Sequence, residues 1–238
     1  MPSVFERNSV LKEMLLNRRV MARDGAVFPV SSAIKPRYAE ALYRFVLERK
    51  PNLVVEIGLA QAASSLSILT ALDEIGGQGR LISIDPFQRN DFREQGLINI
   101  ERAGLSSRHE WIGEPDYLAL PRLLAKGTKV DFGYIDGWHT FDYTLLDFWY
   151  LDKMTAIGAH LAFNDCGWRA VHKAIGFVLT HRKYVEVDVG LKRSVVLGRE
   201  LIRLATGKWG HQYKRMNQDR YFRKVAAWEP PYDFFRSF

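Results

Sequence analysis

Short apolar runs alternate with amphipathic segments along most of this chain. Apolar residues recur at helical spacing over residues 4–22 and again over residues 37–49, so both segments are predicted to be helices. Beyond residue 50, short runs rich in Val, Ile and Leu are each followed by a helical pattern. The predicted strands are residues 53–57, 80–84, 109–112, 130–135 and 159–163, and the predicted helices follow at 64–72, about 92–104, 116–125, 140–154 and 168–180.

Two further strands are predicted at residues 184–189 and 194–197, separated by only four residues. Such a link is too short for a parallel crossover, so these strands are expected to form an antiparallel hairpin. The pattern predicts an α/β fold, a doubly wound, mostly parallel seven-stranded Rossmann-like sheet with a C-terminal antiparallel hairpin. Residues 37–198 form the predicted core. Residues 1–36 precede it, and residues 199–238 are expected to be an extension, helical over about 213–227.

Composition places the chain among globular proteins. The 238 residues are 47% hydrophobic and 26% charged. The single cysteine, Cys166, excludes an internal disulfide and fits a reducing compartment, so we expect a cytoplasmic protein. No membrane span or secretory signal is expected, because Glu56 interrupts the most apolar window and residues 1–20 carry charges throughout.

The net charge of +7 is concentrated at the end of the chain. Residues 199–238 contain nine Lys and Arg against four Asp and Glu. This surplus indicates an anionic partner such as nucleic acid, a membrane surface or a phosphorylated substrate, or simply a solvated basic face.

The turn after the first strand of the predicted sheet carries a candidate ligand site. Small residues, Gly58, Ala60 and Ala62, follow the strand and precede a helix that starts near Ser64. They allow a ligand to lie against the backbone and the free amides of the helix N-terminus. The spacing lacks the second and third glycines of a dinucleotide site, and an ordinary tight strand-to-helix connection is the alternative.

Polar side chains follow the predicted strands at the ends where parallel sheets bind ligands. They are Glu56, Asp85, Glu114, Asp136, Asn164 and Asp165. Asp85 stands where an acid holds the ribose of a nucleoside, and Glu114 could reach an adenine amino group. Any one of these acids could instead be a helix cap.

Asp136, Asn164 and Asp165 are expected at the ends of neighbouring strands, where their oxygens suit a divalent cation such as Mg²⁺. A hydrogen-bonded polar cluster without metal is the alternative. His139 follows close behind Asp136 and could accept a proton near neutral pH, or could cap a helix. Trp138 could cover a flat ligand or pack in the core.

The order of these motifs resembles class I S-adenosylmethionine-dependent methyltransferases. The runs Glu56-Ile-Gly-Leu-Ala-Gln-Ala-Ala-Ser64, Ile-Ser-Ile-Asp85, Ile-Asp136-Gly-Trp-His139 and Phe-Asn164-Asp165 carry the likeness. They are most similar to the metal-dependent O-methyltransferases of the catechol and macrolide-sugar types. The resemblance covers roughly residues 37–198 and implies that residues 1–36 lie on the substrate side.

The resemblance also implies roles for individual residues. Glu56, Gly58, Ala60 and Ser64 would surround the methionine part of S-adenosylmethionine, Asp85 would hold the ribose, and Glu114 and Trp138 would flank the adenine. Asp136, Asn164 and Asp165 match the family's metal triad, with the last acid and amide exchanged. His139 stands where the catechol branch has a lysine, as the base that deprotonates the hydroxyl of a small-molecule acceptor, and Asp136 would act with it in catalysis. The alanine-rich turn departs from the family's glycine-rich loop.

Alternative functions start from the basic tail and the alanine-rich turn. An RNA methyltransferase could use tail aromatics to stack on bases, namely Trp209, Tyr213, Tyr221, Phe222 and Trp228. The tail could equally be a homo-oligomer contact. A non-catalytic S-adenosylmethionine-binding protein is the third possibility, because alanines crowd the cofactor turn.

Overall fold

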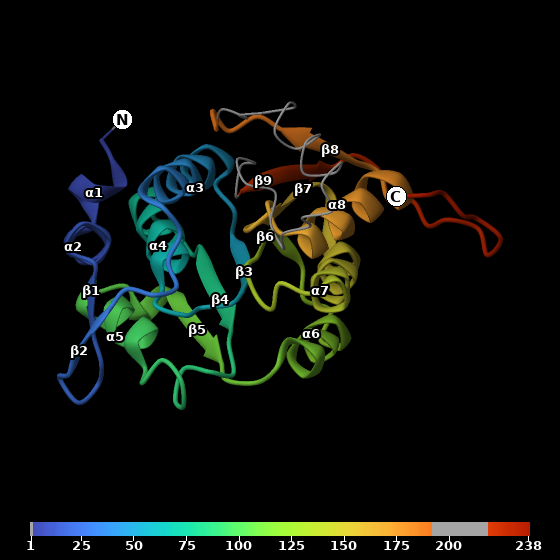
Figure 1. The fold of residues 1–238 in the computed structure, drawn as a ribbon. Helices are drawn as coiled ribbons and strands as arrows, with labels where there is room; N and C mark the ends of the chain where they lie inside the picture. The colour runs from blue at the N-terminus through green and yellow to red at the C-terminus, as the bar shows by residue number, and fades with distance from the viewer. Residues whose placement is uncertain (1, 192–218) are drawn as a thin grey trace, which may run out of the picture.

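A seven-stranded sheet forms the centre of the protein (Figure 1). The computed structural model describes residues 2–191 and 219–238. The strands are β3 (Leu53–Ile57), β4 (Arg80–Ile84), β5 (His109–Ile112), β6 (Val130–Ile135), β7 (Thr155–Phe163), β8 (Tyr184–Val187) and β9 (Arg220–Lys224). Their order is β5-β4-β3-β6-β7-β9-β8. The first five are parallel, whereas β9 runs antiparallel to both β7 and β8, which confirms the predicted fold class.

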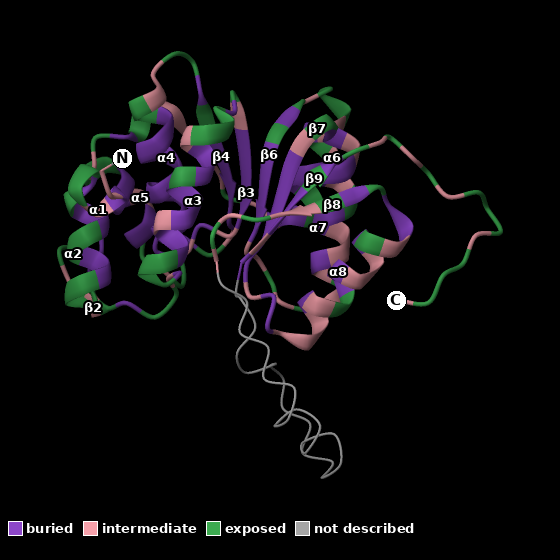
Figure 2. Cartoon of the chain, turned by 90° about the horizontal axis from the view of Figure 1, so that it is seen from above, coloured by how far each residue is buried: buried purple, intermediate pink, exposed green. Residues whose placement is uncertain are grey.

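Helices cover both faces of the sheet because alternate strand residues point to opposite sides. Val54 packs with α3 (Pro36–Arg49), α4 (Ala63–Ile75) and α5 (Gln95–Arg102), whereas Val55 packs with the second set, α6 (Asp116–Ala125), α7 (Phe141–Met154) and α8 (Arg169–His181). A short 3₁₀ helix, η1 (Ser106–Arg108), precedes β5. Figure 2 shows the sheet strands buried between the two helical layers. Among the described residues, no helix combines the length and apolar character needed to cross a bilayer.

The N-terminal segment differs from the single helix predicted over residues 4–22. It forms α1 (Val4–Arg7) and α2 (Ser9–Asn17), then a small antiparallel sheet of β1 (Arg19–Met21) and β2 (Val27–Pro29). Asn8 interrupts the helix because its extended backbone and its side-chain oxygen cap α2, accepting from the Leu11 amide at 2.8 Å. Apolar spacing alone gave no indication of this cap.

The C-terminal hairpin also needs correction. The predicted strand at 194–197 lies outside the described residues, and the strand that pairs with β8 is β9. The predicted helix over residues 213–227 is wrong at Arg220–Lys224, where the chain is extended and Tyr221 and Phe222 are fully buried. A boundary at residue 199 therefore does not separate an extension from the core, because the chain returns to place β9 between β7 and β8.

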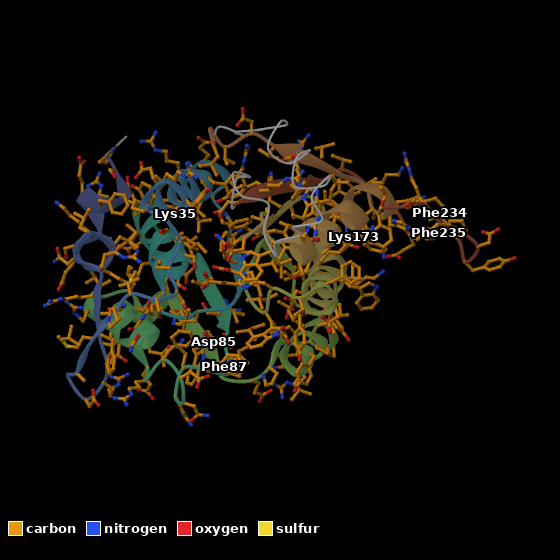
Figure 3. The ribbon with its side chains drawn as sticks, in the orientation of Figure 1. Lys35, Asp85, Phe87, Lys173, Phe234 and Phe235 are labelled. Carbon is orange, nitrogen blue, oxygen red and sulfur yellow. The ribbon has the colours of Figure 1, made fainter. Side chains whose placement is uncertain are left out.

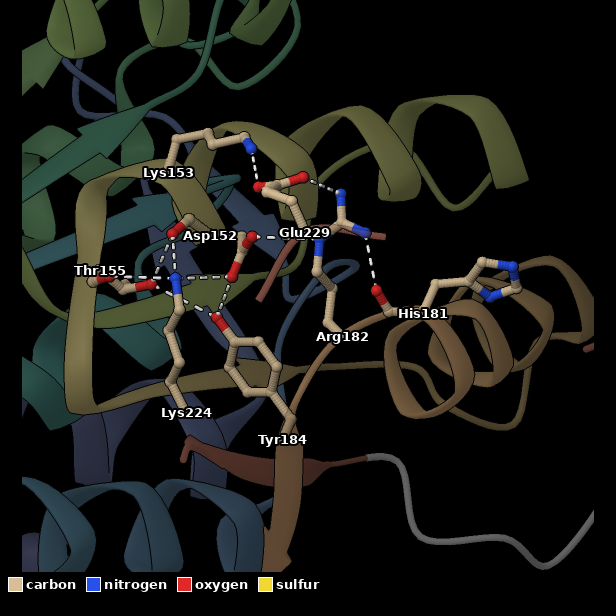
Figure 4. A network of polar contacts seen from close by, with 8 residues as sticks. All are labelled: Asp152, Lys153, Thr155, His181, Arg182, Tyr184, Lys224 and Glu229. Carbon is tan, nitrogen blue, oxygen red and sulfur yellow. Dashed lines mark hydrogen bonds and ion pairs between the residues drawn. The ribbon is translucent and has the colours of Figure 1, made fainter. Parts of the chain in front are cut away.

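A buried ionic network holds this returning strand (Figure 4). Asp152 at the end of α7 pairs with Lys224 of β9 at 2.9 Å and with Arg182 at 3.3 Å, and it accepts a hydrogen bond from the Tyr184 hydroxyl at 2.7 Å. Its side chain is only 4% exposed. Glu229 extends the network by pairing with Arg182 at 3.4 Å. One carboxylate thus neutralises two buried cations from different elements.

Substitution Asp152→Ala is expected to lower the free energy of unfolding by about 3–5 kcal/mol, because it leaves Lys224 and Arg182 buried without their shared partner. Chemical denaturation measures the change. The matched control is Asp73→Ala, which removes a 62% exposed carboxylate paired with Arg108 and should cost at most about 1 kcal/mol. Equal losses from the two variants would contradict the anchoring role of Asp152.

Candidate functional site

A cavity of about 870 Å³ opens at the carboxyl edge of the parallel strands. The residues that follow β3, β4, β6 and β7 line it, together with the segment that enters α3. Figure 3 labels Asp85 and Phe87 after β4, and Lys35 at the start of α3. The polar members of the lining are Ser31, Ser32, Lys35, Tyr38, Ser64, Asp85, Asp91, Asp116, Tyr117, Asp136, His139, Tyr143, Asn164 and Asp165.

The turn after β3 lies in the cavity wall, as predicted, and its backbone is left-handed at three positions. Gly58 has φ +92°, Ala60 has φ +44° and Ala62 has φ +69°. A Cβ at position 58 would stand 2.1 Å from the Asp136 carbonyl oxygen, so only glycine fits there. The two alanines adopt a conformation that costs an ordinary residue roughly 1–2 kcal/mol each, which neighbouring contacts must offset. Alanines therefore stand where glycines were missing from the sequence motif, but the backbone keeps the left-handed conformation that glycine usually adopts.

Asp85 supplies those contacts. Its carboxylate accepts the Leu59 amide at 3.1 Å and the Ala60 amide at 2.7 Å, and it also accepts the Phe87 amide at 2.7 Å. The Gln88 side chain donates to it at 3.0 Å. Asp85 lines the cavity where the ribose contact was predicted, and it also holds the turn in its left-handed conformation.

Glu56 lies behind the cavity wall rather than in it. It is fully buried, accepts from the Ser83 hydroxyl at 2.9 Å and accepts a further hydrogen bond from Ser65 on α4. Burial raises the pKa of Glu56 to about 7, against the opposing effect of the serine hydroxyls. The structure places this predicted cofactor ligand one layer away, where it ties the start of α4 to β3 and β4.

Glu114 is likewise outside the cavity. It forms an ion pair with Arg122 on the surface of α6, whereas the neighbouring Asp116 and Tyr117 line the cavity. Trp138 does line it, 57% exposed, with its ring 6.0 Å from that of Phe87. These two rings give the cavity mouth an apolar rim.

Gln61 joins this turn to the opposite wall and was not singled out by the sequence. Its side-chain oxygen accepts the Ser31 amide at 3.0 Å and the Ser32 amide at 3.2 Å. Its amide nitrogen donates to Gln95 at 2.8 Å. Because Gln61 is 2% exposed, it fixes the segment that enters α3 against the turn after β3. A glutamine in a turn carries no pattern that marks such a role.

The strongest concentration of chemistry lies at the ends of β6 and β7. His139 Nε2 is 2.9 Å from Asp165 Oδ2 and 3.5 Å from Asp136 Oδ1. One ligand atom from each of the three residues lies within 4.8 Å of the others, so together they could hold a metal ion. Asp165 has φ +49°, a left-handed conformation that is uncommon for residues other than glycine. The sequence prediction that Asp136 and Asp165 converge is consistent with this geometry.

The charges of this group depend on one another. Burial raises the pKa of Asp136 to about 6, while His139 opposes the rise. Burial would lower the pKa of His139, but the two carboxylates outweigh it and raise that pKa to about 9. The imidazolium is therefore the favoured form while the carboxylates remain charged, and His139 can accept a proton only when another cation neutralises them.

Asn164 also lines the cavity and directly precedes Asp165. Its side-chain nitrogen donates to Asp219 at 2.7 Å. Asp219 is 1% exposed and immediately precedes β9. The sequence prediction missed it because the residue lies more than fifty positions from its partner, in a segment assigned to a helix. The adjacent aromatic pair Tyr221-Phe222 was the available signal for a strand.

Comparison with known proteins supports the resemblance drawn from the motifs. Residues 55–166, slightly less than half of the chain, match a family described as a methyltransferase domain. No curated protein sequence matches the chain.

Solved structures share the fold at low sequence identity. An O-methyltransferase from Bacillus cereus in complex with S-adenosylhomocysteine is 15% identical, with a TM-score of 0.65 over 91% of each chain. The O-methyltransferase TomG from Streptomyces achromogenes, in complex with S-adenosylmethionine, is 18% identical with a TM-score of 0.57, over 95% of this chain and 100% of its own. A methyltransferase from Geobacter sulfurreducens is 17% identical with a TM-score of 0.56, over 82% of each chain.

The matched residues contain the last three residues of β3, the turn at Gly58, Asp85, Asp136 and the Asn164-Asp165 pair, and these segments adjoin or line the cavity. This agreement confirms the predicted resemblance. Residues 55–166 therefore match a methyltransferase domain, and the chain has the Rossmann-like fold of the methyltransferase structures it resembles.

Proposed function

We propose that the protein transfers a methyl group from S-adenosylmethionine to a hydroxyl group of a small molecule, with a divalent cation at the cavity. The observation that carries the proposal is the meeting of two features in one cavity. The glycine and alanine turn after β3 forms one wall, and Asp136, His139 and Asp165 form the facing group. The O-methyltransferases of the same fold, two of which hold S-adenosylmethionine or its product, support it.

The cofactor would lie along the turn after β3. Gly58 and Ala60 leave the backbone open, and Ser64 lines the cavity from the first turn of α4, where free amides would be available to the cofactor. Asp85 lies close enough to the turn to hold ribose hydroxyls with the lone pairs that its backbone contacts leave. Phe87 and Trp138 offer apolar surface to the adenine, with Asp116 and Tyr117 in place of the predicted Glu114. S-adenosylmethionine supplies an electrophilic methyl on a sulfonium.

The residues at the ends of β6 and β7 fit a divalent cation. Asp136 and Asp165 offer carboxylate oxygens, and Asn164 offers an amide oxygen, the donor set that suits Mg²⁺. His139 lies beside both carboxylates and would stay outside the cation's ligand set, so that Nε2 is left to accept a proton. A bound cation supplies a Lewis acid that lowers the pKa of an acceptor hydroxyl.

The chain's own residues would then orient and deprotonate the acceptor. Asp136 and Asp165 fix the position of the acceptor oxygen opposite the turn after β3, which favours in-line approach to the methyl group. His139 would accept the hydroxyl proton at Nε2 whenever its imidazole is neutral, with Asp136 and Asp165 holding the ring in place. Lys35 and Tyr38 line the far wall and are placed to contact the acceptor.

A small-molecule acceptor agrees with the structure better than RNA does. Two of the tail aromatics invoked for base stacking, Tyr221 and Phe222, are fully buried in the sheet. Trp228 packs against Phe234 in the C-terminal segment and under the Lys183 ammonium. These three aromatics are therefore used in packing and are less available to stack on bases, whereas Trp209 and Tyr213 lie outside the described residues.

Substitution Gly58→Ala is expected to weaken S-adenosylhomocysteine binding at least tenfold, since the added methyl would collide with the Asp136 carbonyl and displace the turn. Isothermal titration calorimetry measures the affinity. The matched control is Gly127→Ala, which has φ +72° but open space around the new Cβ, so it adds similar backbone strain without the collision. A folded Gly58→Ala protein with wild-type affinity would contradict the proposed cofactor position.

Substitution Asp165→Ala should abolish methyl transfer, because it removes a carboxylate shared by the cation site and His139. Transfer of a radiolabelled methyl to a panel of catechols and hydroxylated sugars provides the assay, and a chelator should inhibit the wild type equally. The control is Asp131→Ala, whose carboxylate accepts backbone amides at the opposite edge of the sheet. Chelator-resistant transfer would remove the cation from the proposal.

Substitution His139→Gln is expected to lower the turnover number by about 10²–10⁴-fold, the usual contribution of a general base, while the affinity for S-adenosylhomocysteine stays unchanged. Glutamine keeps a polar side chain of similar length beside Asp136 and Asp165 but cannot take up a proton. Steady-state kinetics and calorimetry separate the two effects. An unchanged turnover number would assign proton transfer to another group.

A further inference from the structure

Asp219 brings the last strand of the sheet into contact with the proposed cation site. One of its carboxylate oxygens accepts the Asn164 side-chain N–H at 2.7 Å. The other accepts the Tyr134 hydroxyl at 3.1 Å and the Tyr221 hydroxyl at 3.4 Å. All four side chains are buried or nearly so, and the network belongs to β6, β7 and β9.

The carboxylate of Asp219 decides which way the Asn164 amide faces. An asparagine side chain has a donor side and an acceptor side, and the donor side of Asn164 faces Asp219. The Asn164 nitrogen therefore points to Asp219. In the flipped orientation the Asn164 oxygen would lie against an Asp219 oxygen, which is unfavourable. Because Asn164 also lines the cavity, its remaining polar atom available there is the carbonyl oxygen Oδ1.

The local charge supports a ligand at this place. Ligand oxygens of Asp136 and Asp165 lie within 4.8 Å of each other, and burial together with the charges of both acids raises the pKa of Asp219. His139 contacts Asp136 and Asp165. A purely structural link between β7 and β9 would not need a third buried acid beside two others. A divalent cation would relieve this repulsion, and the Asn164 oxygen would be its neutral ligand.

We propose that Asp219 is a positioning residue that presents Asn164 Oδ1 as a ligand to the divalent cation held by Asp136 and Asp165. The proposal rests on the cation site of the proposed function. It makes the site depend on β9, a strand that lies outside the residues matching the methyltransferase domain. Asn164 and Asp165 stand in the opposite order to the acid and amide of the family's metal triad. A site of three oxygen ligands is still compatible with this order, because Asp219 would orient the Asn164 oxygen toward the cation.

Binding of Mn²⁺ to the purified full-length protein, measured by electron paramagnetic resonance, tests this without an acceptor. Asp219→Leu and Asn164→Ala should each weaken Mn²⁺ binding about tenfold or more, the usual loss when the partner of a metal ligand is removed. If Asp219 acts through Asn164, the double variant should bind no more weakly than Asn164→Ala alone. An additional loss in the double variant, beyond about twofold, would overturn the positioning role.

Two further variants keep the test decisive where Asp219→Leu does not fold. Asp219→Asn retains an acceptor oxygen for Asn164 and can donate to the tyrosine hydroxyls, so Mn²⁺ affinity should stay within about twofold of wild type. A loss as large as that of Asn164→Ala would show that the charge matters rather than the orientation. Tyr221→Phe is the matched control, because it removes a contact to the other oxygen of Asp219 and should leave Mn²⁺ affinity unchanged.

The outcomes separate this inference from the proposed function. If the wild-type protein binds Mn²⁺ no more tightly than Asp165→Ala does, the cation site and the inference are both overturned. Wild-type binding that Asp165→Ala abolishes, but that Asn164→Ala leaves unchanged, would keep the cation site and overturn only the role of Asp219 and Asn164.

Discussion

The close approach of the turn after β3 to the end of β6 is the constraint on which the site depends. Gly58 lies against the carbonyl of Asp136, with no room for a Cβ between them. The parallel register, Ile57 beside Ile135, brings the two strand ends to the same edge. Because the backbones touch there, the wall that would carry the cofactor and the acidic group that would hold the acceptor face one cavity at a fixed separation.

Acidic side chains in this protein serve two different purposes at that edge. Asp85 and Glu56 use their oxygens to hold local structure: Asp85 accepts amides of the turn, and Glu56 links β3 to α4 through serines. Asp136 and Asp165 are instead both directed to His139. Sequence position at a strand end is the same in both cases, and only the partners within hydrogen-bond reach distinguish the acids that hold local structure from those that surround His139.

The return of the chain as β9 connects stability to the site. At one end of the strand Lys224 is bound by Asp152, and at the other Asp219 is bound by Asn164. The strand also separates β8 from β7 and completes the sheet with two antiparallel pairings. A single short strand is thus held by ionic contacts at one end and adjoins the proposed cation site at the other, so the cavity is built partly by residues distant from its motifs.

The amino-acid sequence determined the five parallel strands, the helices between them, and the polar residues that follow the strands. These features are local: period-two and period-3.6 apolar patterns and short polar interruptions are visible without knowing what packs against them. The convergence of Asp136 and Asp165 followed from topology, since parallel strands present their carboxyl ends at one edge. The broken N-terminal helix was missed because a single cap at Asn8 overrides an apolar pattern that continues beyond it.

Tertiary structure alone decided which residues line the cavity and which strand completes the sheet. Glu56 and Glu114 were chosen by position, but burial behind the wall and an ion pair with Arg122 direct them elsewhere. The pairing of β9 with β7, and with it the contact between Asp219 and Asn164, joins residues more than fifty positions apart. No local pattern encodes such a contact, because its free energy comes from burial and hydrogen bonds that exist only once the sheet has formed.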